Sequence, residues 1–388
     1  MSASNHGRAG GLDLLRLLAA LSVVLYHYTF HGPGAENLTW LSMPLIAPVT
    51  KYGYLGVSLF FVISGFVIAY SAEGRSAREF FIARAARIYP GFLVCMTLTF
   101  AIIVAFGAPR LETSLVQWAA NLAIAAPALG QPYMDSAYWS IVYELVFYGW
   151  VMAFIATGLF ARRLLPLVTG WLILSVANEL LLDLTLVRKL LITDQSGFSA
   201  AGLALYAIFA GRRDTAVWAL LLAATGLAAF QADLSAIWLR ENSIVPVSEA
   251  VAVVAAVGAV GLVGAFLLIR KLPVPSSVLI AVGGLTYPLY LTHQYIGYVT
   301  FNHLQGVAPP AVLVPVVIVI MLSLAWLLYR FVERPAQRIA KIGLSRLLTR
   351  PVLDDQLLQH DVALLAQMAR AGLPLPEGAP SEKQNKAA

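Results

Sequence analysis

Apolar stretches of roughly twenty residues recur along most of the chain, and short polar segments separate them. A helix of that length measures about 30 Å, which matches the hydrocarbon layer of a membrane. The pattern therefore predicts an all-α fold, a polytopic membrane helix bundle with about ten transmembrane helices. The predicted spans are residues 12–31, 54–72, 88–107, 138–160, 164–184, 197–211, 215–232, 247–269, 278–300 and 311–331.

Two segments do not follow this pattern. In the stretch 115–130, polar and helix-breaking residues interrupt a short apolar core, which predicts an outside or re-entrant segment rather than a crossing. Beyond the last span the chain turns basic, then amphipathic, then polar. We therefore expect a transmembrane domain over 1–337 and a cytoplasmic, partly disordered tail over 338–388.

Composition and charge support this class and set its orientation. Hydrophobic residues make up 60% of the chain and charged residues only 12%, which excludes a soluble globular domain. The 26 Lys and Arg against 20 Asp and Glu are interpreted as a topology signal, not as nucleic-acid binding. If residue 1 is cytoplasmic, most basic residues fall in cytoplasmic segments, so both termini are predicted to be cytoplasmic. Counting 115–130 as a span would send Arg162 and Arg163 outside.

The cysteine content excludes two kinds of site. Cys95 is the only cysteine and stands within a predicted span, so neither an internal disulfide nor a thiolate metal site is expected. No metal site is predicted.

Ionisable residues inside spans are costly and therefore mark functional sites by default. Arg16 and His27 stand about three helical turns apart in the first span, on one face and about 16 Å apart along the axis. Arg16 lies toward the cytoplasm and His27 toward the outside. The alternative is structural: Arg16 reaches the membrane interface and His27 makes a packing hydrogen bond.

Two further ionisable residues share the depth of His27. Glu144 lies about 9 Å below the outer end of the fourth span, and His293 stands at a similar depth in the ninth. Two histidines and a carboxylate can form a general-base relay. Alternatively, Glu144 pairs with a structural partner, and His293 makes a polar contact beside Pro288.

Several arginines stand at the predicted cytoplasmic side of the bundle. Arg84 and Arg87 stand one turn apart on one face at the entrance of the third span, and arginine forks suit phosphate oxygens. Arg75 and Arg78 are attributed to ordinary positive-inside charge. A phosphorylated donor held here, with a base about 16 Å deeper, must be long and thin. The pantetheine arm of coenzyme A has that shape.

A set of motifs extends over residues 11–338: Arg16 with His27, GYLGVSLFFVISGFVIAYS at 53–71, Arg84 and Arg87 followed by Ile88-Tyr89-Pro90, Tyr138-Trp139-Ser140 leading to Glu144 and Phe147-Tyr148, Tyr287-Pro288-Leu289-Tyr290-Leu291-Thr292-His293, and Phe331-Val332-Glu333-Arg334-Pro335. In this order and spacing, the motifs resemble those of acyltransferase family 3 membrane proteins.

The resemblance implies transfer of an acyl group, usually acetyl from acetyl-CoA, to a hydroxyl at the bacterial inner membrane. It implies functional roles for His27 and for Arg16, Arg84 and Arg87. Glu144 and His293 also match motif positions. Some family members continue into an extracytoplasmic hydrolase-like domain. Here no fused SGNH-type domain is expected, so the bundle transfers the acyl group itself or hands it to a partner.

The resulting hypothesis is an acyl-CoA-dependent O-acyltransferase. Arg16, Arg84 and Arg87 bind the donor, and His27 acts as general base or acyl carrier, with Glu144 and His293 as further catalytic residues. A saccharide, a lipid-linked glycan or a small molecule with a hydroxyl would serve as acceptor. Ser64 is an alternative nucleophile, although its neighbour Gly65 favours helix packing. The rival hypothesis is a proton-coupled transporter of an anionic solute.

Overall fold

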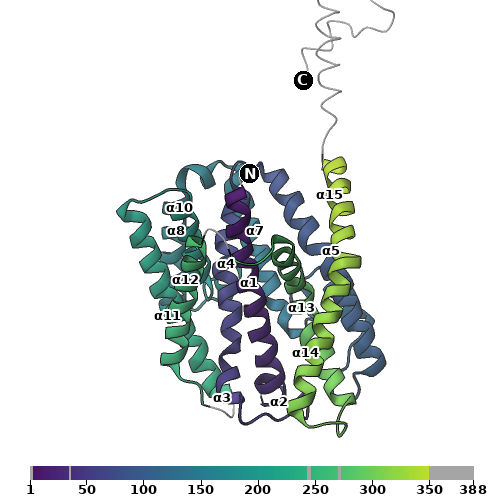
Figure 1. Ribbon diagram of the computed structural model, residues 1–388. Helices are drawn as coiled ribbons and strands as arrows, with labels where there is room; N and C mark the ends of the chain where they lie inside the picture. Colours follow the sequence, from purple (N-terminus) through teal and green to yellow (C-terminus); the bar gives the residue numbers. More distant parts are fainter. Residues whose placement is uncertain (1–2, 35, 243–245, 270–271, 349–388) are drawn as a thin grey trace, which may run out of the picture. The chain divides into compact units, whose positions relative to one another are not determined.

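The computed structural model describes residues 3–34, 36–242, 246–269 and 272–348. Within these ranges every regular element is a helix, so the predicted all-α fold is confirmed. The chain divides into two compact units, Met1–Ala340 and Lys341–Ala388. The first contains the bundle drawn in Figure 1. The predicted tail lies outside the described residues from 349 onward.

Ten long helices build the first unit. They are α1 (Ala3–Tyr26), α4 (Leu55–Ala72), α5 (Ala77–Phe106), α7 (Trp139–Ala156), α8 (Leu159–Ala177), α10 (Ser196–Phe209), α11 (Thr215–Asn242), α12 (Glu249–Leu268), α13 (Ser276–His303) and α14 (Pro310–Leu327). Short helical elements join or extend them: η1 (His27–His31), α2 (Gly32–Gly34), α3 (Ala47–Thr50), η2 (Lys51–Tyr54), α6 (Leu115–Asn121), η3 (Ala126–Leu129), η4 (Ser136–Tyr138), η5 (Asn178–Leu182), α9 (Thr185–Leu191) and η6 (Leu328–Glu333). Helix α15 (Arg334–Leu348) follows η6.

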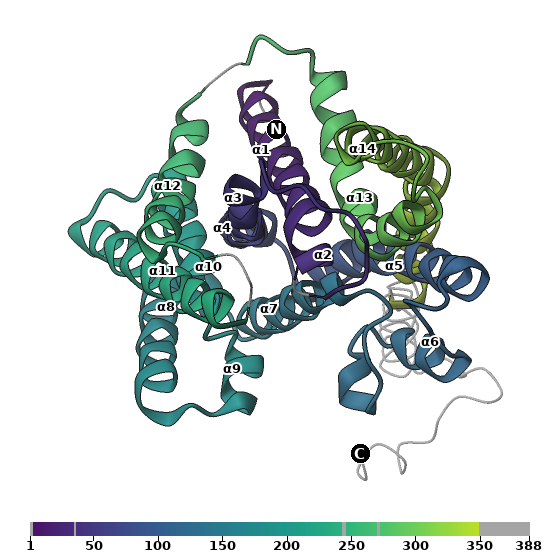
Figure 2. The same ribbon diagram turned by 90° about the horizontal axis from the view of Figure 1, so that it is seen from below.

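Each of the ten predicted spans coincides with one of the long helices. By length and apolar composition, eight segments of the described chain can cross a membrane, which confirms a polytopic helical membrane protein. The other two predicted spans are α10 and α13. Helix α10 has only 14 residues, which is short for a membrane crossing. Helix α13 carries Thr, Tyr, His and Gln side chains in its C-terminal half. Both are largely enclosed by other helices, so neither needs an apolar surface toward lipid (Figure 2).

Glycines permit the closest contact between helices in this unit. A Cβ on Gly202 of α10 would lie 2.1 Å from the carbonyl oxygen of Val62 in α4, and a Cβ on Gly65 would lie 2.1 Å from that of Ser199. No side chain fits at either position without separating the two backbones. The small residues around Gly65 therefore serve helix packing, which is the alternative that the sequence favoured over a nucleophilic Ser64.

The stretch 115–130 folds back along α5. The ring nitrogen of Trp118 donates a hydrogen bond to the Thr97 hydroxyl at 3.2 Å, and the Tyr89 hydroxyl donates to the Leu122 carbonyl at 3.0 Å. Helix α6 has seven residues, about 10 Å, and is too short to cross the bilayer. This agrees with a segment that does not cross.

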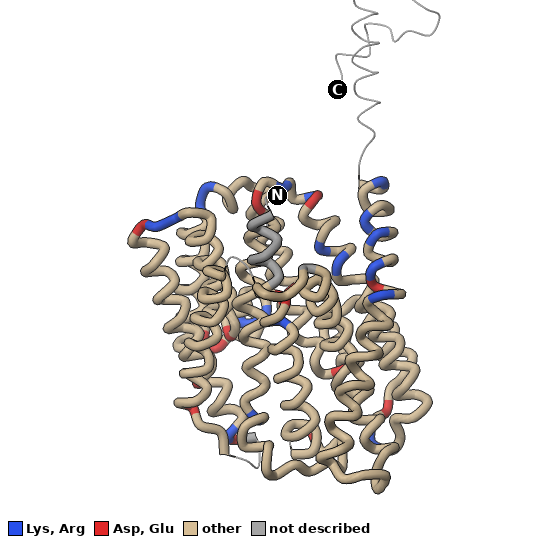
Figure 3. Tube along the Cα trace, viewed as in Figure 1, with Lys and Arg blue, Asp and Glu red and all other residues tan. Residues whose placement is uncertain are grey.

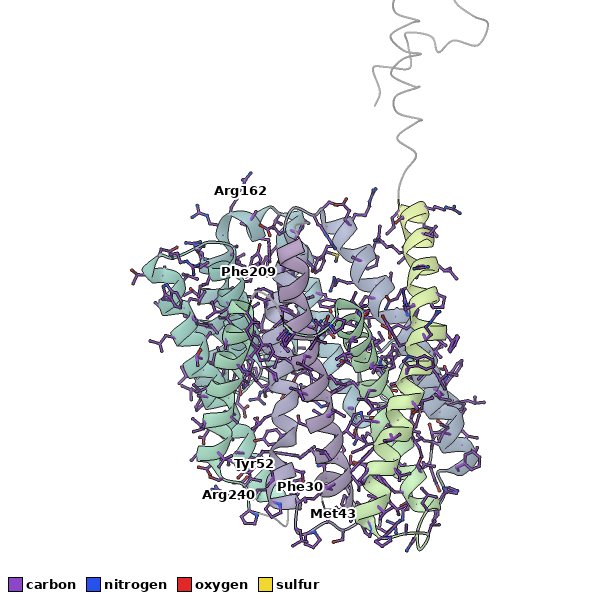
Figure 4. The ribbon with its side chains drawn as sticks, in the orientation of Figure 1. Phe30, Met43, Tyr52, Arg162, Phe209 and Arg240 are labelled. Atoms are coloured by element: carbon purple, nitrogen blue, oxygen red, sulfur yellow. The ribbon has the colours of Figure 1, made fainter. Side chains whose placement is uncertain are left out.

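The two ends of the bundle differ in charge. Lys and Arg residues gather at the end that carries the start of α1 (Figure 3). Arg162 lies at this end, whereas Tyr52, Phe30 and Arg240 lie at the opposite end (Figure 4). The predicted alternation of the spans also puts Arg162 and Arg240 on opposite sides. From here on, the end with Arg162 is called the inner end and the other the outer end, following the charge rule.

Helix α5 begins at a capping box. The Ser76 hydroxyl accepts a hydrogen bond from the Glu79 backbone N–H at 3.2 Å, and the Glu79 carboxylate accepts one from the Ser76 backbone N–H at 2.9 Å. The cap fixes the start of the helix, and Arg84 and Arg87 follow in its second and third turns.

Candidate functional site

A change in helix type places the first histidine. Helix α1 continues into the π-helical turn η1, of which His27 is the first residue, and the backbone N–H of Gly32 donates to the His27 carbonyl. Such turns widen a helix and are frequent at functional sites. Phe30, in the same turn, lies toward the outer end of the bundle (Figure 4). His27 is therefore held in the outer half of the bundle, as its position in the first span predicts.

The His27 ring contacts His293 of α13 directly. The Nε2 atom of His293 lies 3.1 Å from Nδ1 of His27, and the ring centroids are 5.0 Å apart. Both residues are buried: 9% of His27 and none of His293 is exposed. The two histidines that the sequence placed at one depth are thus brought together.

Hydrogen-bond partners decide which nitrogen of each neutral ring carries the proton. The Nδ1 atom of His293 lies 2.8 Å from the Tyr290 carbonyl, which can only accept, so Nδ1 is protonated and Nε2 keeps its lone pair. The Nδ1 atom of His27 faces that lone pair and the Val23 carbonyl at 2.9 Å, so it carries the proton of its ring. Nε2 of His27 is then unprotonated, and it makes no hydrogen bond with any described residue. This is the state that a base or a nucleophile requires.

Contacts on both sides of the histidines fix α13 against its neighbours. The Tyr28 hydroxyl donates to the His293 carbonyl at 2.7 Å, and the Tyr138 hydroxyl donates to the Leu291 carbonyl at 3.0 Å. A Cβ on Gly297 would lie 2.3 Å from the Tyr28 hydroxyl, so only glycine leaves room for this ring. Buried tyrosines and a glycine therefore hold the two imidazoles in register.

A third histidine and a carboxylate complete the outer group, and neither was predicted. The rings of His27 and His31 lie 5.5 Å apart, and Nε2 of His31 lies 3.6 Å from Oε1 of Glu36. Glu36 follows the first membrane-spanning segment, and its backbone N–H donates to the His31 carbonyl at 3.0 Å. Burial raises the pKa of Glu36, but hydrogen bonds from His31, Tyr298 and Gln294, together with the charge of His31, hold it below its ordinary value.

One of these two residues had a signal in the sequence. His31 stands four residues after His27, a spacing that puts both side chains on one face of a helix. Glu36 had no such signal, because it approaches His31 only after the chain turns through Gly32–Gly34.

At the inner end, two of the three predicted arginines already have carboxylate partners. Arg16 lies 3.1 Å from Asp13, one turn away on α1. Arg87 lies 3.0 Å from Oε1 of Glu333, a buried residue of η6 that also accepts a hydrogen bond from Gln337. Both arginines are thus oriented by carboxylates, and an anionic ligand would have to share or replace these partners.

The third arginine, Arg84, lies against aromatic rings rather than a carboxylate. Its guanidinium lies over the rings of Phe80 and Tyr148, at 5.8 and 5.7 Å, and its Nε atom is buried without a hydrogen-bond partner. Within the described part of the chain no carboxylate pairs with it. A half-buried cation with a buried, unused donor is suited to an anionic ligand.

Glu144 belongs to the inner group rather than to the histidines. Its carboxylate accepts a hydrogen bond from the hydroxyl of Tyr148, the residue that Arg84 covers. No hydrogen bond among the described residues joins Glu144 to His27 or His293. The six predicted site residues therefore fall into two groups, one around the two histidines and one around the three arginines with Glu144.

This arrangement defines a polytopic membrane protein with an unprotonated imidazole nitrogen in its outer half and an arginine cluster at its inner end. The chain belongs to the acyltransferase domain family, which it matches over residues 10–330. The resemblance to acyltransferase family 3 is thus confirmed.

Three curated proteins are similar to parts of the chain, and the names of two of them agree with this membership. O-acetyltransferase OatA of Staphylococcus aureus is 35% identical over 102 residues, which cover 24% of this chain and 14% of the relative. Acyltransferase MdmB of Streptomyces mycarofaciens is 31% identical over 149 residues, 36% of this chain and 38% of the relative. Nodulation protein 10 of Rhizobium leguminosarum bv. viciae is 36% identical over 94 residues, 23% of this chain and 24% of the relative. The chain thus matches well under half the length of each relative. No solved structure is significantly similar to it.

Proposed function

We propose that this chain is a membrane-embedded O-acyltransferase of the bacterial inner membrane, with both termini cytoplasmic. It transfers an acyl group from cytoplasmic acyl-CoA to a hydroxyl of a saccharide or a related acceptor, and we take acetyl as the acyl group. The observation that carries the proposal is the unprotonated, unpartnered Nε2 of His27, held by His293 in a member of the acyltransferase domain family. The names of two relatives, an O-acetyltransferase and an acyltransferase, support the reaction class.

In a base mechanism, Nε2 of His27 accepts the proton of the acceptor hydroxyl as its oxygen attacks the thioester carbonyl. The carbon–sulfur bond breaks, and the coenzyme A thiolate takes the proton back from His27, so no net charge remains. During this step the His27 ring is positive, and its Nδ1–H faces the lone pair of His293 at 3.1 Å. His293 would thereby stabilise the imidazolium and fix its orientation.

In a carrier mechanism, Nε2 of His27 attacks the thioester itself and the coenzyme A thiolate leaves. The acyl group then rests on His27 as an acyl-imidazolium until the acceptor hydroxyl attacks it. The bond from the acyl carbon to Nε2 breaks, Nε2 regains its lone pair, and the hydroxyl proton ends on the coenzyme A thiolate. The same lone pair serves both mechanisms. They differ in one observable: only the carrier route gives acyl-labelled His27 before an acceptor is added.

Donor binding is proposed at the inner group. Arg84 has an unused buried donor and is the arginine most open to a phosphate oxygen. Arg16 and Arg87 would bind further phosphate oxygens beside Asp13 and Glu333. Glu144 accepts a hydrogen bond from the Tyr148 hydroxyl and would thereby orient the Tyr148 ring beside Arg84.

Thermal unfolding of the purified full chain, with and without acetyl-CoA, tests this donor site without knowledge of the acceptor. A ligand that binds only the folded protein raises Tm with concentration; at 100 times Kd the stabilisation is about 2.7 kcal/mol. We expect this rise in the wild type, its loss in Arg84→Ala, and its retention in the control Arg75→Ala, which removes an exposed arginine of the same end.

Two results would contradict the donor site. An equal Tm rise in Arg84→Ala and wild type would remove Arg84 from it. No rise in folded wild-type protein would contradict acyl-CoA binding and favour the transporter hypothesis.

A further inference from the structure

Glu36 lies at the centre of a polar group beside the histidines. Its carboxylate contacts Nε2 of His31 at 3.6 Å, the Ser136 hydroxyl at 3.3 Å and the Gln294 amide nitrogen at 3.2 Å. The side chains of Glu36 and His31 are each 19% exposed, so the group reaches solvent. Three separate parts of the chain thus converge on one carboxylate: the turn after η1, the start of η4, and α13.

Gln294 carries an unused acceptor within this group. Its side chain is fully buried, and its Nε2 donates to Glu36 and, at 2.6 Å, to the Ser136 hydroxyl. Exchanging the amide nitrogen and oxygen would set an oxygen against the carboxylate, so these contacts fix the amide orientation. The amide oxygen, Oε1, is buried without a hydrogen-bond partner. An unpaired buried acceptor destabilises a protein unless a ligand or water supplies a donor.

Chain position puts this group next to the proposed base. Gln294 directly follows His293, whose Nε2 faces His27, and His31 stands one turn after His27. The rings of His27 and His31 lie 5.5 Å apart and His31 contacts Glu36, so a molecule bound to Glu36 and Gln294 would be near the His27 ring, at the end opposite the arginines.

Resting on the proposed function, we infer that Glu36, Gln294 and Ser136 form the acceptor subsite, and that it takes a hydroxyl-rich ring such as a pyranoside. An ionised carboxylate and an amide oxygen accept hydrogen bonds from two hydroxyls, while a third hydroxyl of the same ring is presented to His27. An acceptor without these extra hydroxyls leaves both oxygens unpaired and is discriminated against for that reason.

The test uses the full chain in lipid nanodiscs with acetyl-CoA and measures free coenzyme A thiol, after subtraction of the rate without acceptor. The probes are the methyl pyranosides of glucose, galactose and mannose, and cyclohexylmethanol, which offers a hydroxymethyl group on a six-membered ring without ring hydroxyls. Glu36→Gln and Gln294→Leu are compared with Glu112→Gln, which removes an exposed carboxylate from the loop before α6.

We expect Glu36→Gln and Gln294→Leu to raise KM for the best pyranoside by about 10- to 100-fold, the loss of one hydrogen bond to a charged or buried group. KM for acetyl-CoA should stay within about twofold of wild type, turnover of cyclohexylmethanol should not change, and Glu112→Gln should behave as wild type.

Three results would overturn the inference: an unchanged KM for the pyranoside, an equal loss with cyclohexylmethanol, or a wild type that transfers to cyclohexylmethanol as well as to any pyranoside. A wild type that neither binds acetyl-CoA nor transfers acetyl to any probe contradicts the proposed function itself. The two failures are therefore distinguishable.

Discussion

At the scale of single residues, the central feature is the chain of hydrogen bonds through two imidazoles. The Tyr290 carbonyl fixes the proton of His293 on Nδ1, and His293 in turn fixes the proton of His27 on Nδ1. The reactive nitrogen of His27 is thus set by a residue 266 positions away. A backbone carbonyl performs the orienting role that a carboxylate fills in many base relays.

The first prediction concerns His27. Because its Nε2 is the proposed base or carrier, His27→Gln should lower acetyl transfer by at least about 10²-fold, within the range usual for a general base. The acetyl-CoA-dependent rise in Tm should persist, since the arginines are unchanged. The rate of acetyl transfer is measured as release of free coenzyme A thiol with the best acceptor. The rise in Tm is measured by thermal unfolding.

His303→Ala is the matched control, because this histidine is exposed at the end of α13, where its ring packs against Phe106 and its Nδ1 lies 3.0 Å from the Val299 carbonyl. It should transfer acetyl at the wild-type rate. Wild-type transfer by His27→Gln would remove His27 from the mechanism.

At the scale of elements, two close helix contacts shape the bundle. Gly65 and Gly202 let the backbones of α4 and α10 touch, and Gly297 lets Tyr28 of η1 pass beneath α13. A side chain at position 297 would push Tyr28 away from α13, and the distance between the histidines would grow. The site geometry therefore depends on positions that contribute no chemistry.

The second prediction follows from the α4–α10 contact. Gly202→Ala places a methyl group 2.1 Å from a backbone oxygen that cannot rotate away, so it should destabilise the fold by about 1–3 kcal/mol. Gly170→Ala is the control: it lies in α8 with nothing within 4 Å of the new methyl group. That change should be neutral or stabilise by up to about 1 kcal/mol. Tm in detergent distinguishes the two, and equal Tm values would contradict the packing argument.

At the scale of the whole bundle, the two polar groups face opposite ends. Arg84 and Arg87 stand near the start of α5, which lies at the end that carries Arg162 (Figure 1). His31 directly follows Phe30, which lies at the end that carries Arg240 (Figure 4), and it contacts Glu36. A donor from one side and an acceptor from the other would meet between them. This separation fits transfer across a membrane, and it depends on the orientation that the charge rule predicts.

The third prediction tests that orientation. In a Cys95→Ala background, Arg162→Cys and Arg240→Cys each leave one exposed thiol, at opposite ends of the bundle. A membrane-impermeant maleimide added to intact cells whose outer barrier admits it should label only the Arg240→Cys protein. The Arg162→Cys protein should react after the inner membrane is permeabilised. The reverse order would place both termini outside and exclude a cytoplasmic donor at the arginines.

Much of the fold could be predicted because membrane insertion is governed by local composition. Each predicted span coincides with a helix, since about twenty apolar residues in lipid have few alternatives to a helix. The stretch 115–130 was interpreted as not crossing, because its polar residues leave too short an apolar core. The site was predicted less completely: His27 and His293 were matched by depth, but Glu144 turned out to bind Tyr148.

The amino-acid sequence by itself determined the class, the family and the inventory of ionisable groups, because the bilayer makes each such group conspicuous among apolar neighbours. Only the tertiary structure decided which of them meet. Depth along a helix does not specify which helices are neighbours or how each is rotated about its axis. The contact of His27 with His293, the approach of Glu36 to His31, and the pairing of Arg87 with Glu333 all depend on these two properties, which glycine contacts and buried tyrosines establish between distant parts of the chain.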